Sequence, residues 1–231
     1  MLGWVIPPPR EPVKTGRDFE RERAAKVKAL VQSGYLKSEL IRQALLKVRR
    51  EDFIPRLYRD YAYLEVPLPL PGDHATISCP HSYPLFYEPL CLDAGHRFME
   101  VGVGSGYGIA VAREIVGEHG LVVGVEIDPV TLRFARANLE RAGYDDALLI
   151  RADGARGYPA LQPYDRISVT AACKAIPPPL IEQLVAGGRV IAPVFAGHVQ
   201  NLVVVEKTSD GLRTTEICQV LYVSLRGEYG V

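Results

Sequence analysis

The stretch Phe98-Met99-Glu100-Val101-Gly102-Val103-Gly104-Ser105-Gly106 decides the fold of this chain. Residues 97–101 predict a buried strand, and three alternating glycines lead from it into an apolar helical pattern over residues 107–116. Glycine at such positions lets the backbone turn tightly and approach a ligand without an intervening Cβ atom. The stretch therefore predicts a strand, a ligand-binding loop and a helix, in that order.

The spacing of the glycines narrows the class of ligand. A dinucleotide-binding loop has the pattern Gly-x-Gly-x-x-Gly, and counting from Gly102 places Tyr107 at the third glycine, where the helix normally packs closely on the strand. The lysine of a loop that binds nucleoside triphosphates is also missing. The pattern Gly102-x-Gly104-x-Gly106 instead resembles the S-adenosylmethionine loop of Rossmann-like methyltransferases.

Acidic residues at the ends of the next two predicted strands support that ligand. Glu126, beside Ile127, can accept hydrogen bonds from both ribose hydroxyls of a bound nucleoside. Asp153, beside Gly154, can reach the adenine edge. Glu100 either contacts the methionine part of the cofactor or only satisfies loop amides. The predicted cofactor contacts in this core are Glu100, Gly102, Gly104, Gly106, Glu126, Ile127, Asp153 and Gly154.

Strands and helices alternate after the loop. We expect strands at 121–127, 147–151, 166–170 and 189–194, and helices at 129–142 and 179–185. Asp128 is the expected N-cap of the first of these helices and Gly143 its end, whereas Gly187 and Gly188 are expected to end the second. Two further β-rich runs, 201–207 and 217–225, predict an antiparallel pair. The fold class is therefore α/β, a Rossmann-like S-adenosylmethionine-dependent methyltransferase fold with a doubly wound, mostly parallel sheet, an antiparallel C-terminal strand pair and N-terminal helices.

The first 94 residues lack this alternation. Residues 1–16 are rich in proline and predict an extended arm on the surface or on a partner subunit. Amphipathic helices are expected at 17–32 and 38–50, followed by a long irregular segment at 53–75, which a compact domain rarely keeps without a use. We expect the arm, 1–16, and a single methyltransferase domain, 17–231, made of a helical and irregular substrate-side segment, 17–94, and a Rossmann-like core, 95–231.

Composition restricts the class of protein further. The chain has 231 residues, 48% hydrophobic and 23% charged, which suits one sizeable core and excludes disordered and collagen-like chains. Lys plus Arg and Asp plus Glu both total 27, so no net field favours nucleic acid or an anionic membrane. No apolar run approaches the roughly 20 residues of a membrane span. We expect a cytoplasmic protein with neither nucleic acid nor membrane as a partner, and the sequence leaves its oligomeric state open.

The four cysteines, Cys79, Cys91, Cys173 and Cys218, are far apart and form no Cys-x-x-Cys pair, so the sequence predicts neither a metal site nor a redox motif. All four are expected to be reduced and buried. Cys79 is expected to pack rather than react, since the sequence places no basic residue to lower its pKa. His81 is expected to be a surface or capping residue at the start of a helix.

Four blocks of the sequence, within about residues 27–225, resemble the protein-L-isoaspartate (D-aspartate) O-methyltransferase family. They are Val48-Arg49-Arg50-Glu51-Asp52-Phe53-Ile54-Pro55, Ala75-Thr76-Ile77-Ser78-Cys79-Pro80-His81, Asp153-Gly154-Ala155-Arg156-Gly157-Tyr158-Pro159 with Val169-Thr170-Ala171-Ala172, and Leu180-Ile181-Glu182-Gln183-Leu184 with Gly187-Gly188-Arg189. Cys79 stands where the family commonly has glutamine or alanine, and Tyr222-Val223-Ser224-Leu225 where it has Phe-Val-Pro-Leu. We expect these differences to affect substrate preference rather than the reaction.

The resemblance implies an activity and a site. Members of the family use S-adenosylmethionine to methylate the free α-carboxyl of L-isoaspartyl residues in damaged proteins and peptides, and the ester then collapses towards a succinimide, which begins repair. Thr76, Ile77 and Ser78 would lie where cofactor and substrate meet, with Ser78 as the active-site residue. A free α-carboxyl has a pKa of roughly 3.5 and is already ionised at neutral pH, so the reaction needs no strong general base. Ser78 is then expected to orient a carboxylate oxygen, or, alternatively, only to cap the helix after Pro80.

Two other readings of the function stay open. Another class I methyltransferase, acting on a small molecule or a nucleic acid, would share the fold and the cofactor. A nucleic-acid N-methyltransferase usually has Asn or Asp followed by Pro-Pro and an aromatic residue after the fourth strand, where this chain has Thr170-Ala171-Ala172, and the neutral net charge also argues against phosphate contacts. A non-catalytic S-adenosylmethionine-binding protein would keep the pocket alone, and the intact Ser78, Glu126 and Asp153 make it the weaker alternative.

Overall fold

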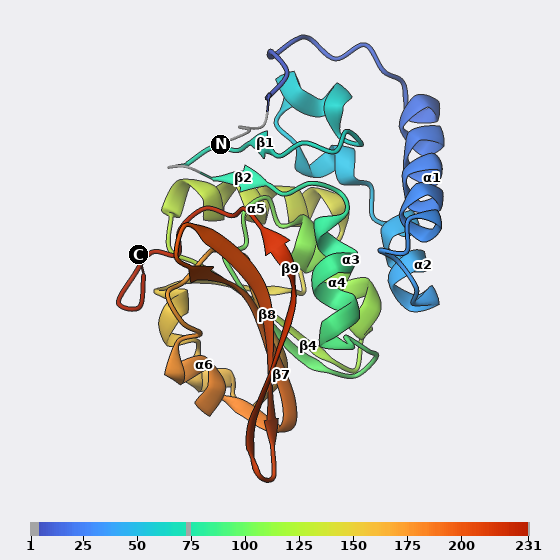
Figure 1. The fold of residues 1–231 in the computed structure, drawn as a ribbon. Coiled ribbons are helices and arrows are strands. Elements are labelled where there is room, and N and C mark those ends of the chain that lie inside the picture. Colours follow the sequence, from blue (N-terminus) through green and yellow to red (C-terminus); the bar gives the residue numbers. More distant parts are fainter. Residues whose placement is uncertain (1–4, 73–74, 231) are drawn as a thin grey trace.

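A single seven-stranded sheet runs through the middle of the protein in the computed structural model, which describes residues 5–72 and 75–230 (Figure 1). Its strand order is β5-β4-β3-β6-β7-β8-β9. The strands are β3 (Arg97–Val101), β4 (Leu121–Glu126), β5 (Leu148–Arg151), β6 (Tyr164–Val169), β7 (Leu184–Ala196), β8 (Val199–Thr208) and β9 (Gly211–Val220). Neighbours from β5 to β7 are parallel, and β8 and β9 are antiparallel. The predicted doubly wound sheet with its antiparallel pair is confirmed.

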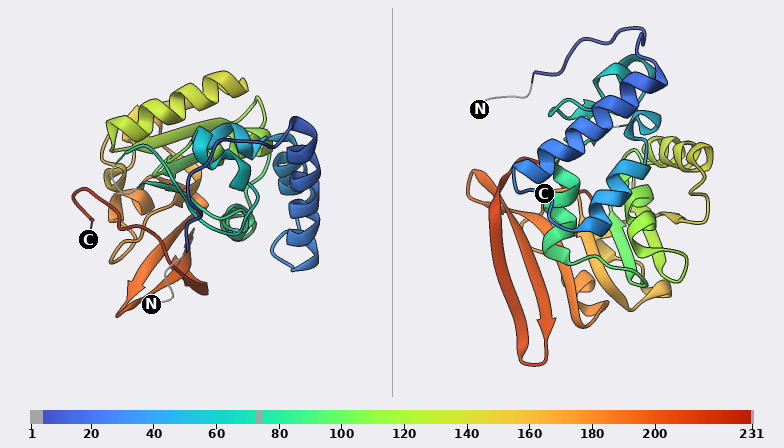
Figure 2. Two further views of the ribbon diagram at one scale, coloured as in Figure 1. Left: turned by 90° about the horizontal axis from the view of Figure 1, so that it is seen from above. Right: turned by 90° about the vertical axis from the view of Figure 1, so that its right-hand side faces the viewer.

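The central strands are apolar on both faces because helices cover both faces. Phe98 and Met99 are adjacent in β3 and fully buried, yet they belong to different hydrophobic clusters, since successive side chains of a strand point to opposite faces. One face carries three helices and the other a short helix with two 3₁₀ turns (Figure 2). They are α3 (Ser82–Leu90), α4 (Tyr107–Val116) and α5 (Pro129–Ala142) on the first face, and α6 (Pro178–Glu182), η3 (Gly154–Arg156) and η4 (Pro159–Leu161) on the second.

The N-terminal helices form an outer layer over α4. Helix α1 (Gly16–Gln32) begins with a capping box between Thr15 and Asp18, and α2 (Glu39–Lys47) packs between α1 and α4. The expected irregular segment contains the 3₁₀ helix η2 (Arg56–Tyr61) and the strand β1 (Leu68–Pro69), which pairs with β2 (Thr76–Ile77). Asp60 in η2 is 2% exposed and accepts hydrogen bonds from the backbone of Val13 and Lys14, which ties residues 5–15 to η2. Residues 1–4 of the predicted arm lie outside the described residues, and the division into arm and domain stays a prediction.

Several predicted boundaries differ from the structure. Helix α2 ends at Lys47 rather than at residue 50, because Val48 is extended and the next residues form η1 (Arg50–Phe53), which turns the Arg50 side chain inward. Helix α6 ends at Glu182, and the two glycines expected to end it lie inside β7, next to a register shift between β6 and β7. Strand β9 begins directly at Gly211 after the hairpin turn and ends at Val220, because residues 221–225 leave the strand and cross to residue 172.

The expectation that all four cysteines are buried was wrong for two of them. Cys79 and Cys173 are buried, whereas Cys91 and Cys218 are exposed, and all four are free thiols. Cys91 follows α3 in a left-handed conformation, and Cys218 lies on the outermost strand of the sheet. None of the helices within the described residues is long and apolar enough to cross a membrane.

Asp128 caps α5 as the sequence predicts, and its removal tests the start of that helix. Its Oδ1 atom accepts hydrogen bonds from the backbone N–H of Val130 (2.9 Å) and Thr131 (2.8 Å). We expect Asp128→Ala to lower the free energy of unfolding by about 0.5–2 kcal/mol in urea titrations at neutral pH. Glu140→Ala, on the exposed side of the same helix, serves as the control.

The pH dependence of that loss is a second readout. The hydrogen bond from the backbone N–H of Thr131, above all, holds the pKa of Asp128 below its usual value. A lowered folded-state pKa means that the carboxylate stabilises the protein above the unfolded-state pKa and loses that effect as the pH falls through the folded-state pKa. The difference between wild type and Asp128→Ala should therefore shrink in acid, and a difference that grows in acid would contradict the assignment.

Candidate active site

A cavity of about 1090 Å³ opens at the carboxyl ends of β3, β4 and β6. The chain passes from β3 to β4 and β5 on one side and then returns to β6 on the other side, so β3 and β6 flank the point where the strand order reverses. Ligands of open α/β sheets bind at such a switch point. Residues of β2, the start of α3 and the segment that follows β9 complete the walls.

The loop after β3 brings bare backbone to the floor of this cavity. Gly102 has φ +87°, and a Cβ atom there would lie 2.6 Å from Oγ1 of Thr170. Its N–H donates to the carbonyl of Val125 (2.9 Å), and the hydroxyl of Thr170 donates to its carbonyl (2.6 Å), so β4 and β6 hold the loop from both sides. Gly104 also lines the cavity. Gly106 is not among the described lining residues; it caps α4 and packs against Leu139 of α5.

Glu126 places a carboxylate at the end of β4 beside that loop. It is 6% exposed, and its two oxygens accept hydrogen bonds from the backbone N–H of Gly104 (3.3 Å) and of Asp128 (3.0 Å). A carboxylate offers about four acceptor positions, so two of them stay available to the hydroxyls of a ligand. Ile127, the next residue, lines the cavity as well. The predicted grouping of Gly102, Gly104, Glu126 and Ile127 is found in the structure.

Asp153 has a different position from the one its sequence context indicates. Its carboxylate accepts hydrogen bonds from the backbone N–H of Ala155 (3.0 Å) and Glu228 (2.9 Å). A Cβ atom on Gly227 would lie 2.1 Å from Oδ1, so the C-terminal segment packs directly on this carboxylate. Gly154 lines the cavity, whereas Asp153 is absent from the described lining residues. In this structure Asp153 fastens the end of the chain, and Gly154 is the residue at this strand end that lines the cavity.

Glu100 is buried at the back of the cavity. It is 3% exposed, and the pKa of its carboxyl is raised to about 8: burial is the main cause, a hydrogen bond from Tyr87 (3.3 Å) opposes the rise, and the nearby Glu126 carboxylate adds to it. Burial at this position therefore favours the neutral form of the Glu100 carboxyl. A Cβ atom on Gly108 would lie 2.6 Å from this carboxyl group, so a glycine in the first turn of α4 is required for the helix to approach β3.

The residues Thr76, Ile77 and Ser78 line the same cavity from the opposite side. Ser78 follows β2 and does not cap a helix, because α3 begins at Ser82 and its N-cap position is His81. Burial raises the pKa of Tyr222 above its usual value, and hydrogen bonding with the hydroxyls of Ser82 and Ser78 offsets part of that rise. The structural alternative, that Ser78 only caps the helix after Pro80, is therefore wrong.

Two residues of the site were missed by the sequence analysis. Arg50 is 1% exposed; its Nη2 donates to the carbonyl of Ser78 (2.6 Å) and its Nε to the carbonyl of Ala62 (2.7 Å). Its guanidinium lies over the rings of Tyr83 and Tyr107, at 5.6 and 5.3 Å from the ring centroids. The only sequence feature that points to Arg50 is its position in the first block that resembles the family, and that block alone does not predict a role for it.

The second missed residue, Tyr222, belongs to the segment after β9 that closes the cavity over Ser78. Its backbone is fixed by Gln200, which donates to the Tyr222 carbonyl (3.0 Å) and accepts from the Tyr222 N–H (2.6 Å). The sequence feature that points to Tyr222 is the stretch Tyr-Val-Ser-Leu at 222–225, which differs from the family pattern.

The strand order and the position of the cavity are those of the Rossmann-like fold of S-adenosylmethionine-dependent methyltransferases. The family model of protein-L-isoaspartate(D-aspartate) O-methyltransferase matches residues 21–230. The protein-L-isoaspartate O-methyltransferase of Hyperthermus butylicus is 45% identical over 92% of this chain and 91% of its own length, and that of Methanopyrus kandleri is 44% identical over 92% and 94%. The chain belongs to this family.

Solved structures agree with that assignment. A protein-L-isoaspartate O-methyltransferase with 32% sequence identity superimposes with a TM-score of 0.82, covering 90% of this chain and 67% of that one. A β-aspartate methyltransferase from Plasmodium falciparum, solved in complex with S-adenosyl-L-homocysteine, is 23% identical, covers 88% of this chain and 98% of that one, and has a TM-score of 0.79, which shows the shared fold.

The close approach at Gly102 leads to a stability prediction with an internal control. We expect Gly102→Ala to lower the free energy of unfolding by more than Gly143→Ala does. Both glycines have positive φ, which costs an alanine about 1–2 kcal/mol, but a Cβ atom at Gly143 meets nothing within 4 Å, whereas at Gly102 it meets Thr170. Urea titrations measure both losses, and equal losses would show that the loop has room at Gly102.

Proposed function

We propose that this protein transfers the methyl group of S-adenosylmethionine to the free α-carboxyl of L-isoaspartyl residues in proteins and peptides, and so begins their repair through a succinimide. The observation that carries the proposal is one cavity lined both by Gly102, Gly104 and Glu126 and by Thr76, Ile77 and Ser78. Membership of the protein-L-isoaspartate(D-aspartate) O-methyltransferase family supports it independently.

The cavity suits S-adenosylmethionine in three respects. Bare backbone at Gly102 and Gly104 leaves room for close approach of a ligand, and the Glu126 carboxylate has acceptor positions for two ribose hydroxyls. The buried carboxyl of Glu100 lies behind the loop, where it can bind the cationic ammonium group of the methionine moiety. When bound, the cofactor supplies an electrophilic methyl group on a sulfonium sulfur.

On the acceptor side, the residues have to bind and align a carboxylate that is already ionised. The Ser78 hydroxyl donates a hydrogen bond to one carboxylate oxygen, while the other oxygen stays free to attack. Arg50 fixes the Ser78 backbone through its carbonyl, and Tyr222 lies against the hydroxyl. Attack on a sulfonium neutralises two opposite charges, so a site that excludes water favours the step, and alignment lowers its entropic cost.

Nucleic acid is not among the proposed partners. Phosphate contacts require a surplus of basic side chains, and this chain has a formal net charge of +0. Neither a nucleic-acid nor a small-molecule substrate is favoured by a specific feature of the cavity. A cytoplasmic location stays a prediction from the sequence.

The proposed activity is tested directly with a pair of isomeric peptides. With radiolabelled S-adenosylmethionine, we expect methyl transfer to an L-isoaspartyl peptide and little or none to the aspartyl isomer of the same sequence, because the two isomers present different carboxyl groups. Cofactor binding without transfer to any isoaspartyl peptide would instead support a non-catalytic binding protein.

Glu126→Gln tests the nucleoside end of the cavity. The substitution keeps the shape but removes the charge of the acceptor, and we expect the dissociation constant for S-adenosylhomocysteine to rise about 10- to 100-fold in isothermal titration calorimetry, since hydrogen bonds to charged groups are worth about 1.5–3 kcal/mol each. Glu118→Gln removes an exposed charge after α4 and is the matched control. An unchanged affinity would remove Glu126 from the binding site.

Ser78→Ala tests the acceptor end. Loss of one charge-assisted hydrogen bond should lower kcat/KM for an isoaspartyl peptide by about 10- to 150-fold and leave the affinity for S-adenosylhomocysteine unchanged. Ser33→Ala, which removes a hydroxyl that donates to Leu30 at the end of α1, is the control. Wild-type turnover in the Ser78→Ala variant would show that the hydroxyl has no part in the reaction.

A further inference from the structure

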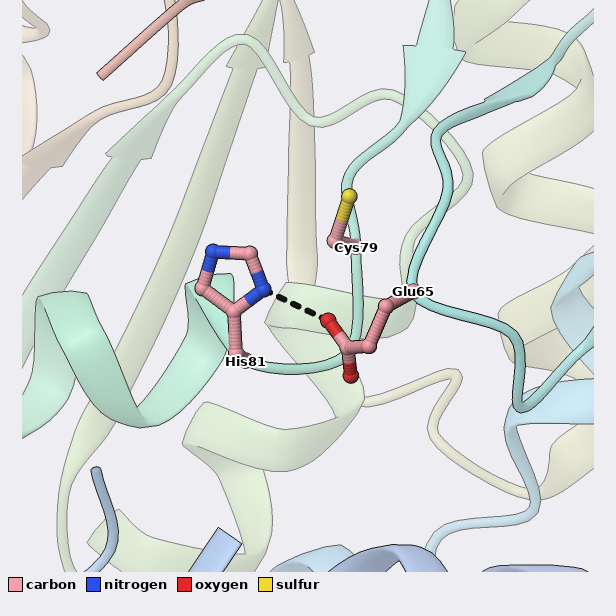
Figure 3. Close-up of side chains that lie close together, drawn as sticks. All are labelled: Glu65, Cys79 and His81. Carbon is pink, nitrogen blue, oxygen red and sulfur yellow. Dashed lines mark hydrogen bonds and ion pairs between the residues drawn. The ribbon is translucent and has the colours of Figure 1, made fainter. Parts of the chain in front are cut away.

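Three side chains of different chemistry meet at the wall of the cavity (Figure 3): Glu65, Cys79 and His81. One potential metal-ligand atom from each lies within 4.8 Å of the other two. Nδ1 of His81 and Oε2 of Glu65 are 2.6 Å apart. Cys79 and His81 both line the cavity, and Cys79 directly follows Ser78 in the chain.

The sequence does not predict this cluster because its members come from two segments. Cys79 and His81 lie in the turn between β2 and α3, separated by Pro80, and their spacing matches no common zinc motif. Glu65 lies before β1, and the antiparallel pairing of β1 with β2 brings it opposite that turn. The side chain of His81 makes no capping hydrogen bond to α3, contrary to the capping role considered from the sequence.

A thiolate, an imidazole and a carboxylate together are a ligand set for Zn²⁺, whereas Mg²⁺ and Ca²⁺ favour sites made of oxygen atoms. Around a tetrahedral Zn²⁺ such ligand atoms lie about 3.3–3.6 Å from one another. Nδ1 of His81 and Oε2 of Glu65, now 2.6 Å apart, must therefore separate by less than about 1 Å. The other distances between ligand atoms, which are at most 4.8 Å, must shorten by about 1 Å. Metal binding therefore requires small side-chain rotations of Glu65 and Cys79.

The surroundings suit a bound dication. Nζ of Lys26 donates to Oε1 of Glu65 (3.0 Å), which leaves Oε2, the oxygen facing His81, as the ligand atom. Hydrogen bonds of this kind to the second oxygen orient ligating carboxylates in metalloproteins. The thiolate and the carboxylate would balance the two charges of the metal. On binding, the thiol proton of Cys79 leaves to solvent, and the proton of neutral His81 resides on Nε2.

We propose that Glu65, Cys79 and His81 form a Zn²⁺ site with three protein ligands and an open fourth position, next to the acceptor residue Ser78. The open position accepts water or a carboxylate oxygen. A metal ion there competes with Ser78 for the carboxylate of the substrate and restrains the turn that carries Ser78. Bound Zn²⁺ therefore inhibits methyl transfer.

Cobalt spectroscopy tests the site without relying on activity. In a Cys91→Ser/Cys218→Ser protein, which lacks the two exposed thiols, titration with Co²⁺ should give the near-ultraviolet thiolate-to-cobalt charge-transfer band and the visible bands of tetrahedral cobalt. These bands should saturate at one equivalent and disappear when Zn²⁺ is added, because Zn²⁺ binds such sites more tightly than Co²⁺. Absence of the charge-transfer band at one equivalent would overturn the proposal.

Variants of each ligand identify the site. Cys79→Ser in the same background should abolish the charge-transfer band, and His81→Gln and Glu65→Gln should each raise the dissociation constant for Co²⁺ at least about 10-fold. His96→Gln, at a histidine outside the cluster, should leave it unchanged, and circular dichroism verifies folding of each variant. A band that persists in Cys79→Ser, or full affinity in a folded His81→Gln protein, would place the metal elsewhere and refute the assignment.

The inhibitory role has its own readout, in the Cys91→Ser/Cys218→Ser protein. Zn²⁺ should lower the rate of methyl transfer to an isoaspartyl peptide with a midpoint that matches its displacement of Co²⁺, and a chelator should restore the rate. Stoichiometric binding with an unchanged rate would refute inhibition while leaving the site in place. If the protein transfers no methyl group even without metal, the proposed function fails, and the spectroscopic result still decides the metal site.

Discussion

The site depends on the way in which the end of β3 is fixed between its two neighbouring strands. The N–H of Gly102 bonds to Val125 of β4, and the Thr170 hydroxyl at the end of β6 bonds to the Gly102 carbonyl. The carboxylate of Glu126 then accepts a hydrogen bond from the backbone N–H of Gly104. A Cβ atom at Gly102 would collide with Thr170, so the loop can pack this closely against Thr170 only with glycine at that position. The space for a ligand and the position of the carboxylate both follow from this arrangement.

The acceptor side of the cavity depends on a buried cation. Arg50 donates to the carbonyl of Ser78 and lies over two tyrosine rings, so a residue of the segment before the core fixes the backbone of Ser78. Arg50 is 1% exposed, and hydrogen bonds in such a water-excluded position are stronger than in water. Residues of the segment before the core and of the core itself line the same cavity, so its shape depends on how these two parts pack together.

Sequence reasoning succeeded where a local rule fixes the structure. Strand 97–101, helix 107–116 and the cap at Asp128 were predicted because periodicity, glycine spacing and capping are properties of neighbouring residues. It failed where partners distant in sequence decide the outcome. The glycines at 187 and 188 resemble a helix end, yet they lie in an irregular stretch of β7 because Leu184 and Arg189 on either side of them pair with β6. Asp153 is predicted to contact the ligand, whereas in the structure its carboxylate accepts a hydrogen bond from the C-terminal segment.

The residues of the acceptor side show the same limit. Ser78 is predicted from its sequence block. Arg50 lies 28 positions before Ser78 in the chain, and Tyr222 lies well over a hundred positions after it, yet both contact Ser78 in the fold. The cluster of Glu65 with Cys79 and His81 likewise exists only because β1 pairs with β2. Contacts of this kind have no signature in spacing or periodicity.

The most direct test of this account is a crystal structure of the protein with S-adenosylhomocysteine. We predict that the nucleoside lies across Gly102 and Gly104, that both ribose hydroxyls bond to the carboxylate of Glu126, and that the sulfur points towards Ser78. A ligand bound elsewhere, or a ribose held without Glu126, would contradict the account.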